Sequence, residues 1–179
     1  MNINFPTILY KIKTVKTEYS CFNLADLLVN LDLSEQSLLL IRGLPGCGKG
    51  ESAKAVCEKF NNTVHFEADM YFQKGDKYLY KRSQLKNAHK WCYYQTVESL
   101  SKGFNVCVAN TFIEQWEIQE YLDAADFFKI NLVIIECAVQ QYNTQKVFKD
   151  KIEQMKGRWE IISIKKEQEI DFSKIFYDN

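Results

Sequence analysis

A glycine-rich segment early in the chain has the composition of a phosphate-binding loop. It reads Gly43-Leu44-Pro45-Gly46-Cys47-Gly48-Lys49 and lies between a continuous apolar run and a stretch of helix-forming residues. Between a strand and a helix, such glycines let backbone N–H groups converge on phosphate oxygens, and the helix N-terminus adds a partial positive charge. Lys49 would then reach the β and γ oxygens of a nucleoside triphosphate, which makes it a candidate catalytic residue.

The residues after Lys49 depart from the usual form of this loop. The pattern G-x-x-x-x-G-K-[ST] places a Mg²⁺-binding hydroxyl directly after the lysine. This chain instead has Gly50 and Glu51, and its nearest hydroxyl is Ser52, which we predict as a metal ligand. An acidic side chain such as Glu51 can hold a metal ion through water or repel the nucleotide. We expect Gly50→Ser to raise metal-dependent turnover if the protein is a weak enzyme.

Polar residues also follow two of the predicted strands. Asp69 lies in the segment Glu67-Ala68-Asp69-Met70-Tyr71-Phe72, after the second strand. Because the carboxyl ends of strands in an open α/β sheet face the ligand crevice, Asp69 is expected to accept a proton from an attacking hydroxyl or to hold a metal ion. The alternative is that Asp69 only caps a helix. Asn110 and Thr111, after the third strand, would orient a water or the acceptor, or only form a turn.

Two more side chains are candidates for the acceptor side and for charge stabilisation. His89 lies in a long predicted helix with Leu85 and Tyr93 one turn away on either side. A buried histidine is therefore the default interpretation, and a role as donor or base toward the acceptor is the alternative. Arg158 is a candidate because guanidinium groups often stabilise the charge that develops in phosphoryl transfer, although a salt bridge at a helix end explains it equally well.

The elements that must position these residues alternate along the chain. Continuous apolar runs are typical of strands buried on both faces of a parallel sheet. We predict strands at 8–15, 38–41, 64–66, 105–109 and 132–135, and helices at 22–31, 51–60, 79–102 and 116–125, with Gly103 ending the longest helix. This alternation predicts an α/β fold in which helices flank a parallel sheet through right-handed crossovers.

Composition limits the classes of partner. The chain has 179 residues, and its 23 Lys and Arg balance 23 Asp and Glu, so a long nucleic-acid footprint is not expected, whereas a short site remains open. No apolar run approaches the ~18 residues of a membrane span, and no secretion signal is recognisable at the start. We therefore expect a cytoplasmic protein without a membrane partner. The six cysteines lack the spacing of a zinc or disulfide framework.

Several segments, in order and spacing, carry a family resemblance. They are Arg42 to Lys49, Glu67 to Phe72, Ala88 to Cys92, Asn110 to Phe112 with Trp116-Glu117, and Ile152 to Glu160. Together they resemble the AAA-type P-loop kinase-like ATPases related to phage 5′-polynucleotide kinases and zeta toxins. The resemblance implies a nucleoside-kinase-like three-layer sandwich, with residues 1–36 as an extension packed on a single domain at 37–179.

The resemblance also implies roles for individual residues. ATP and Mg would be the cofactors, with residues 43–52 binding the nucleotide and Lys49 on its phosphates. Asp69 would stand at the place of the polynucleotide kinases' general base, and His89 and Arg158 fall within matching motifs. The resemblance implies no particular acceptor and leaves the oligomeric state open.

Two functions follow from these residues. The first is a kinase that transfers the γ-phosphoryl group of ATP to a hydroxyl on a nucleic-acid 5′ end or a small molecule. The second is a catalytically degenerate nucleotide-binding protein with a regulatory or interaction role. The second is what a missing hydroxyl at Gly50 predicts, together with Ala109, where polynucleotide kinases usually place an acidic residue. Gln145 and Phe148 also stand where many relatives have His and Pro.

Overall fold

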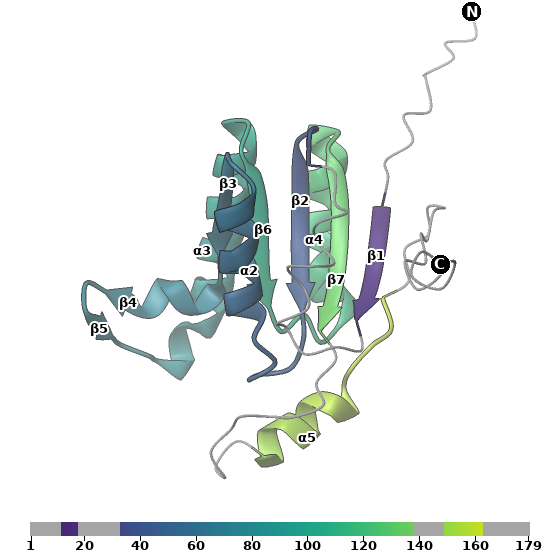
Figure 1. Cartoon of the computed structure of the whole chain (residues 1–179). Coiled ribbons are helices and arrows are strands. Elements are labelled where there is room, and N and C mark those ends of the chain that lie inside the picture. The colour runs from purple at the N-terminus through teal and green to yellow at the C-terminus, as the bar shows by residue number, and fades with distance from the viewer. Residues whose placement is uncertain (1–11, 18–32, 138–148, 163–179) are drawn as a thin grey trace, which may run out of the picture.

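One parallel sheet organises the computed structural model, which describes residues 12–17, 33–137 and 149–162 (Figure 1). Its five strands have the order β1-β7-β2-β6-β3. Their bounds are Ile12–Thr17 (β1), Ser37–Arg42 (β2), Thr63–Phe66 (β3), Asn105–Asn110 (β6) and Asn131–Cys137 (β7). Every residue of β2 and β6 is buried, which explains their unbroken apolar sequences. The predicted parallel α/β fold is confirmed.

Helices cover both faces of this sheet. On one face, Leu39 and Ile41 of β2 pack with Ala53 and Val56 of α2 (Lys49–Lys59). On the other, the alternate residues of the same strands pack against α3 (Leu85–Ser101) and α4 (Gln115–Phe128), as Figure 1 shows. Successive strand residues point to opposite faces, so a continuous apolar run supplies both cores. The result is the expected three-layer arrangement.

A hairpin separates β3 from α3, where the sequence predicts the start of a long helix. The segment contains η2 (Ala68–Phe72), β4 (Gln73–Lys74), β5 (Lys77–Tyr78) and η3 (Arg82–Gln84). The N–H of Leu79 donates to the Phe72 carbonyl oxygen at 2.9 Å, which closes the hairpin, and Lys81 is extended. The predicted helical start at residue 79 is therefore wrong. The predicted end is right, because Gly103 has a φ of 84° directly after the helix.

The outer parts of the chain match the sequence less closely. Strand β1 begins within the predicted strand 8–15 and pairs in parallel with β7, so part of the predicted N-terminal extension joins the sheet. The predicted helix 22–31, together with Gln145 and Phe148, lies outside the described residues. Helix α4 continues to Phe128, and Lys129 then takes a φ of 58°. Helix α5 (Lys149–Gly157) lies beyond the carboxyl ends of the strands (Figure 1).

Most cysteines in the described part of the chain are buried. In the described ranges, Cys47, Cys57, Cys92, Cys107 and Cys137 form no disulfide, and Cys21 falls in a range that the structure does not describe. Burial raises the pKa of Cys92 to about 11 and also raises that of Cys107.

None of the described helices combines the length and apolar character needed to cross a bilayer.

Candidate nucleotide-binding site

The glycine-rich loop joins β2 to α2 at the carboxyl edge of the sheet. Gly46 and Gly48 have φ values of 82° and 83°, a backbone region that glycine adopts without strain. A Cβ on Gly43 would lie 2.6 Å from the Sγ of Cys47, so the loop folds tightly over its own start. These features give the turn and the helix N-terminus that a phosphate-binding loop requires.

Lys49 is the first residue of α2, and its ammonium folds back over this loop. Its Nζ donates to the Leu44 carbonyl oxygen at 3.0 Å and lies 3.7 Å from the Sγ of Cys47. Leu44, Pro45 and Gly46 are all at least partly exposed. The positive charge is therefore held against the loop backbone.

Of the three residues after Lys49, Ser52 has a side-chain oxygen bonded to the loop, and Glu51 is paired elsewhere. Ser52 is buried, and its hydroxyl donates to the Gly48 carbonyl oxygen at 3.1 Å, within the first turn of the helix. Glu51 is exposed and pairs with Lys54 at 3.0 Å. At Gly50, an added Cβ would lie inside van der Waals contact of the Glu67 carboxylate. The Glu67 carboxylate already fills the space that a serine side chain at position 50 would need. Gly50→Ser would therefore displace Glu67.

Asp69 lies just beyond the carboxyl end of β3, within η2, and is exposed. The N-cap of η2 is Glu67, without a side-chain capping bond, so Asp69 does not have the capping role considered from sequence. Its carboxylate interacts with Tyr78 of the hairpin. Partial burial raises the pKa of Tyr78, and the charge of Asp69 and a hydrogen bond to its carboxylate raise it further.

The end of β6 fastens the loop and the Asp69 segment to the same strand. The side-chain oxygen of Asn110 accepts from the Ala68 N–H at 2.9 Å, and the Thr111 carbonyl oxygen accepts from the Gly43 N–H at 3.3 Å. Asn110 is buried and also donates to the Sγ of Cys92 at 3.5 Å. These contacts support a positioning role for Asn110 and Thr111.

His89 and Arg158 lie at the surface. The expectation of a buried His89 is wrong, because its side chain is exposed although Leu85 and Tyr93 pack against the core. Its charge nevertheless acts on Glu117 at the start of α4: burial raises the pKa of Glu117, while the Ile113 N–H, His89 and Arg158 oppose that shift. Arg158 has a side chain that is 58% exposed and lies 3.7 Å from Glu114. It therefore has the ion pair that the sequence offered as an alternative.

Sequence reasoning gave no role to Arg42, which lies at the end of β2 with no exposed surface. Its guanidinium donates to the carbonyl oxygens of Glu160 at 3.0 Å and Ile113 at 3.2 Å, and lies 3.5 Å from the Glu136 carboxylate. The Trp159 ring covers it at 3.9 Å. Burial lowers the pKa of Arg42, and Glu136 opposes this effect. The sequence signals were its charge at the end of an apolar run and its place at the start of the first motif that carries the family resemblance.

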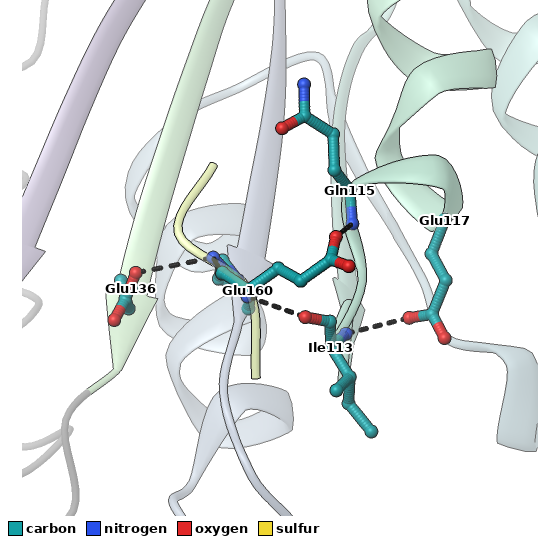
Figure 2. Close-up of polar contacts among 6 residues, drawn as sticks. Ile113, Gln115, Glu117, Glu136 and Glu160 are labelled. Carbon is teal, nitrogen blue, oxygen red and sulfur yellow. Dashed lines mark hydrogen bonds and ion pairs between the residues drawn. The ribbon is translucent and has the colours of Figure 1, made fainter. Parts of the chain in front are cut away.

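The neighbours of Arg42 form a polar network across the carboxyl edge of the sheet (Figure 2). The Glu160 carboxylate accepts from the Gln115 N–H at 2.7 Å, and Glu117 accepts from the Ile113 N–H at 2.8 Å. Residues 158–160, which follow α5, are thereby tied to β2, β7 and the start of α4. This attachment explains why the last predicted motif lies near the loop.

The residues present fit a nucleotide with Mg²⁺. Within the described ranges, no group of three or more His, Cys, Asp or Glu side chains forms a cage for a metal ion. Such a cage is not required, because Mg²⁺ is usually held by one or two carboxylates together with substrate phosphates. Glu67 beside Gly50 and the exposed Asp69 are two such carboxylates. The loop glycines and Lys49 suit the phosphates.

The layered parallel sheet, the glycine-rich loop between β2 and α2 and the polar strand ends define a P-loop kinase-like protein. The chain belongs to the AAA domain family, whose model matches residues 38–156. The resemblance found in the sequence is confirmed.

Individual relatives share only part of their length with this chain. Human (Homo sapiens) NEDD4-binding protein 2 is 29% identical over 100 residues, which are 55% of this chain and 6% of that protein. A chain of the Pnkp1/Rnl/Hen1 RNA repair complex is similar in structure, with a TM-score of 0.51 and 16% identity. That match covers 78% of this chain and 51% of the other. A second chain, from a Pnkp1/Rnl/Hen1 complex, has a TM-score of 0.47, 17% identity and coverages of 80% and 46%.

Proposed function

We propose that this protein is an ATP-dependent kinase that phosphorylates the 5′-hydroxyl of single-stranded nucleic acid. The observation that carries the proposal is the position of Asp69. Its exposed carboxylate lies at the same edge of the sheet as the glycine-rich loop and next to Tyr78 of an aromatic hairpin. A general base must be within reach of both the phosphate site and the acceptor.

In the proposed reaction, the loop N–H groups and Lys49 hold the β- and γ-phosphates, and Asp69 orients the acceptor hydroxyl. The acceptor oxygen forms a bond to the γ-phosphorus as the bond from that phosphorus to the β–γ bridging oxygen breaks. Asp69 takes the hydroxyl proton, and ADP leaves with the electrons of the broken bond. When bound, Mg²⁺ would neutralise charge on the phosphates.

The hairpin beside Asp69 supports a nucleic-acid acceptor. Tyr78 and Tyr80 are 53% and 47% exposed, and their rings stack at 6.5 Å with an interplanar angle of 15°. Exposed cations on the same segment are Lys74, Lys77, Lys81 and Arg82. Aromatic platforms with flanking positive charge bind single strands by base stacking and phosphate contact.

The central test is Asp69→Asn, assayed by transfer of labelled γ-phosphate to a 5′-hydroxyl oligonucleotide. The amide keeps the shape of the side chain but cannot take the proton. We expect unchanged ATP binding by calorimetry and a rate reduced by about 10²- to 10⁴-fold. Asp76→Asn, the same change at an exposed position in the hairpin turn, serves as the control. Lys49→Ala should remove ATP binding from the folded protein.

Full activity of Asp69→Asn would show that the acceptor is activated elsewhere, with His89 the next residue to test. Labelling of small hydroxyl compounds but not of oligonucleotides would contradict the proposed acceptor. A 5′-phosphorylated oligonucleotide should accept no label.

The second candidate is a nucleotide-binding protein without catalysis. It is favoured by Gly50, which offers no hydroxyl, and by the hydrogen bond that engages Lys49 with the loop. ATP binding without phosphoryl transfer, at every divalent metal and with every acceptor tested, would establish this second function and exclude the first.

A further inference from the structure

Gly50 and Glu67 form a pair at the point where the loop meets α2. Gly50 stands directly after the loop lysine, where the usual motif has a hydroxyl residue. A Cβ built there would overlap the Glu67 Oε1 and would lie 3.3 Å from the carboxylate carbon. The Glu67 carboxylate therefore occupies the space that a serine or threonine side chain would fill. Glycine at position 50 leaves this space to the Glu67 carboxylate, and a larger residue would push that carboxylate aside.

His65 lies beside the same carboxylate oxygen. The His65 side chain is 8% exposed, and its Nε2 lies 3.0 Å from Oε1 of Glu67. That approach lacks hydrogen-bond alignment, and Nε2 has no hydrogen-bond partner among the residues the structure describes. A buried polar group this close limits where the carboxylate can lie, as the neighbours of metal-ligating groups do. Glu67 itself is 26% exposed and so is reachable from the loop.

We propose that Glu67 replaces the missing loop hydroxyl as the protein ligand of the divalent cation that accompanies the nucleotide. The proposal rests on the nucleotide binding proposed above. A carboxylate oxygen is a hard ligand of the kind Mg²⁺ prefers, and it offsets cation charge that a hydroxyl would leave in place. On this account, the protein still supplies a ligand to the cation. The ligand comes from Glu67, directly after β3, and not from a hydroxyl at position 50.

A carboxylate near a triphosphate has an opposite possible effect, which is repulsion. The two effects differ in which state of the nucleotide they change. If Glu67 holds the cation, removing its charge weakens binding of ATP with Mg²⁺. If Glu67 only repels phosphate, removing its charge tightens binding of ATP without metal and does not weaken binding with Mg²⁺.

The experiment measures ATP affinity by calorimetry, with Mg²⁺ and with a chelator, on the full chain. Glu67→Gln keeps the size of the side chain and its packing on Gly50. We expect its affinity for ATP with Mg²⁺ to fall by at least about tenfold, while its affinity in chelator does not fall. Glu58→Gln, which removes an exposed carboxylate near the other end of α2, should leave both affinities unchanged.

A ligand exchange provides the second arm. Glu67→Ala should weaken ATP binding with Mg²⁺, and adding Gly50→Ser in the same protein should restore most of it, because the hydroxyl then enters the vacated space. The paramagnetic resonance spectrum of bound Mn²⁺, recorded in the presence of ATP, should change with Glu67→Gln and not with Glu58→Gln. This signal does not depend on turnover.

Three results would overturn the proposal. Unchanged or tighter binding of ATP with Mg²⁺ in Glu67→Gln would assign Glu67 a structural or repulsive role. The same conclusion follows if Gly50→Ser fails to rescue Glu67→Ala while both proteins unfold at the wild-type temperature. Absence of ATP binding in the wild type would overturn this proposal and the proposed function together, whereas the first two results leave the kinase proposal standing.

Discussion

Arg42 is a fully buried positive charge with partners in several parts of the fold. It has no exposed surface, and its guanidinium contacts Glu136 of β7, Ile113 just before α4, and residues 159–160 at once. A guanidinium can serve these partners because its planar fork presents several donors in a fixed geometry. The charge is taken out of water, so its partners must replace the lost hydration. Loss of Arg42 therefore affects several elements together.

We predict that Arg42→Leu lowers the free energy of unfolding by about 3–5 kcal/mol, because the Glu136 carboxylate and two carbonyl oxygens lose their partner. Urea unfolding followed by tryptophan fluorescence measures this difference. Glu136→Gln, which removes the charge of a side chain that is 27% exposed but keeps an oxygen that can accept from Arg42, should cost less than Arg42→Leu. Equal costs for the two variants would mean that the network around Arg42 does not depend on its burial.

At the residue scale, the sequence predicts side chains whose roles are local. Lys49 and Asp69 could be placed because each follows a strand at a position that the loop motif or the sheet topology defines. The contact between Glu67 and Gly50 could not be predicted, because it joins the end of β3 to the start of α2. His89 was misplaced for a related reason: helical periodicity shows which residues share a face, but not what covers that face.

At the scale of elements, the start of α4 contains a carboxylate whose ionisation opposes folding. Glu117 lies in the first turn and accepts the Ile113 N–H at 2.8 Å, yet burial raises its pKa above the ordinary value of 4.5. A raised pKa means that the folded state binds the proton more tightly than the unfolded state. The contribution of Glu117 to stability is therefore full at low pH and is lost as the pH rises through its folded-state pKa.

We predict that Glu117→Gln, whose amide oxygen can still accept the Ile113 N–H, becomes more stable relative to wild type as the pH rises from below 4.5 toward neutrality. The measurement is the free energy of unfolding in urea at a series of pH values. Glu120→Gln, an exposed position on the same helix, is the control and should show no such trend. A constant difference across the series would contradict the raised pKa of Glu117.

The elements that were predicted best are those with the strongest physical constraint. β2, β6 and β7 are continuous apolar runs because both of their faces are covered. The β4–β5 hairpin was missed because Leu79 and Tyr80 extend the apolar pattern of α3 toward its N-terminus. The pair Gly75-Asp76 was the available signal, since Gly75 forms the turn with a φ of 59°.

At the scale of the whole molecule, one edge of the sheet gathers every part of the proposed site. The loop follows β2, Asp69 follows β3, and β6 lies between these strands and is bonded to both segments at its end. Residues 158–160 are tied to the same edge through Arg42. The net charge of the whole chain is zero, so the molecule has no general attraction for polyanions. Affinity for nucleic acid must therefore come from a small surface.

That surface is the hairpin, which leads to a prediction about binding of 5′-hydroxyl oligonucleotides. We expect Tyr78→Ala and Tyr80→Ala each to weaken binding by about 1–3 kcal/mol, as for the loss of one base stack. Tyr94→Ala, which removes a tyrosine that is 63% exposed on α3, should have no effect. Fluorescence anisotropy of a labelled single strand gives these affinities.

The same titrations, repeated over a range of salt, test how small the nucleic-acid site is. The exposed cations on the hairpin segment are Lys74, Lys77, Lys81 and Arg82, and each phosphate neutralised on a single strand contributes about −0.7 to the slope of log K against log salt. We therefore expect a slope no steeper than about −3, and no steepening once the oligonucleotide is long enough to cover the hairpin. A slope that grows with oligonucleotide length would place phosphate contacts beyond the hairpin and contradict a site that reads only the 5′ end.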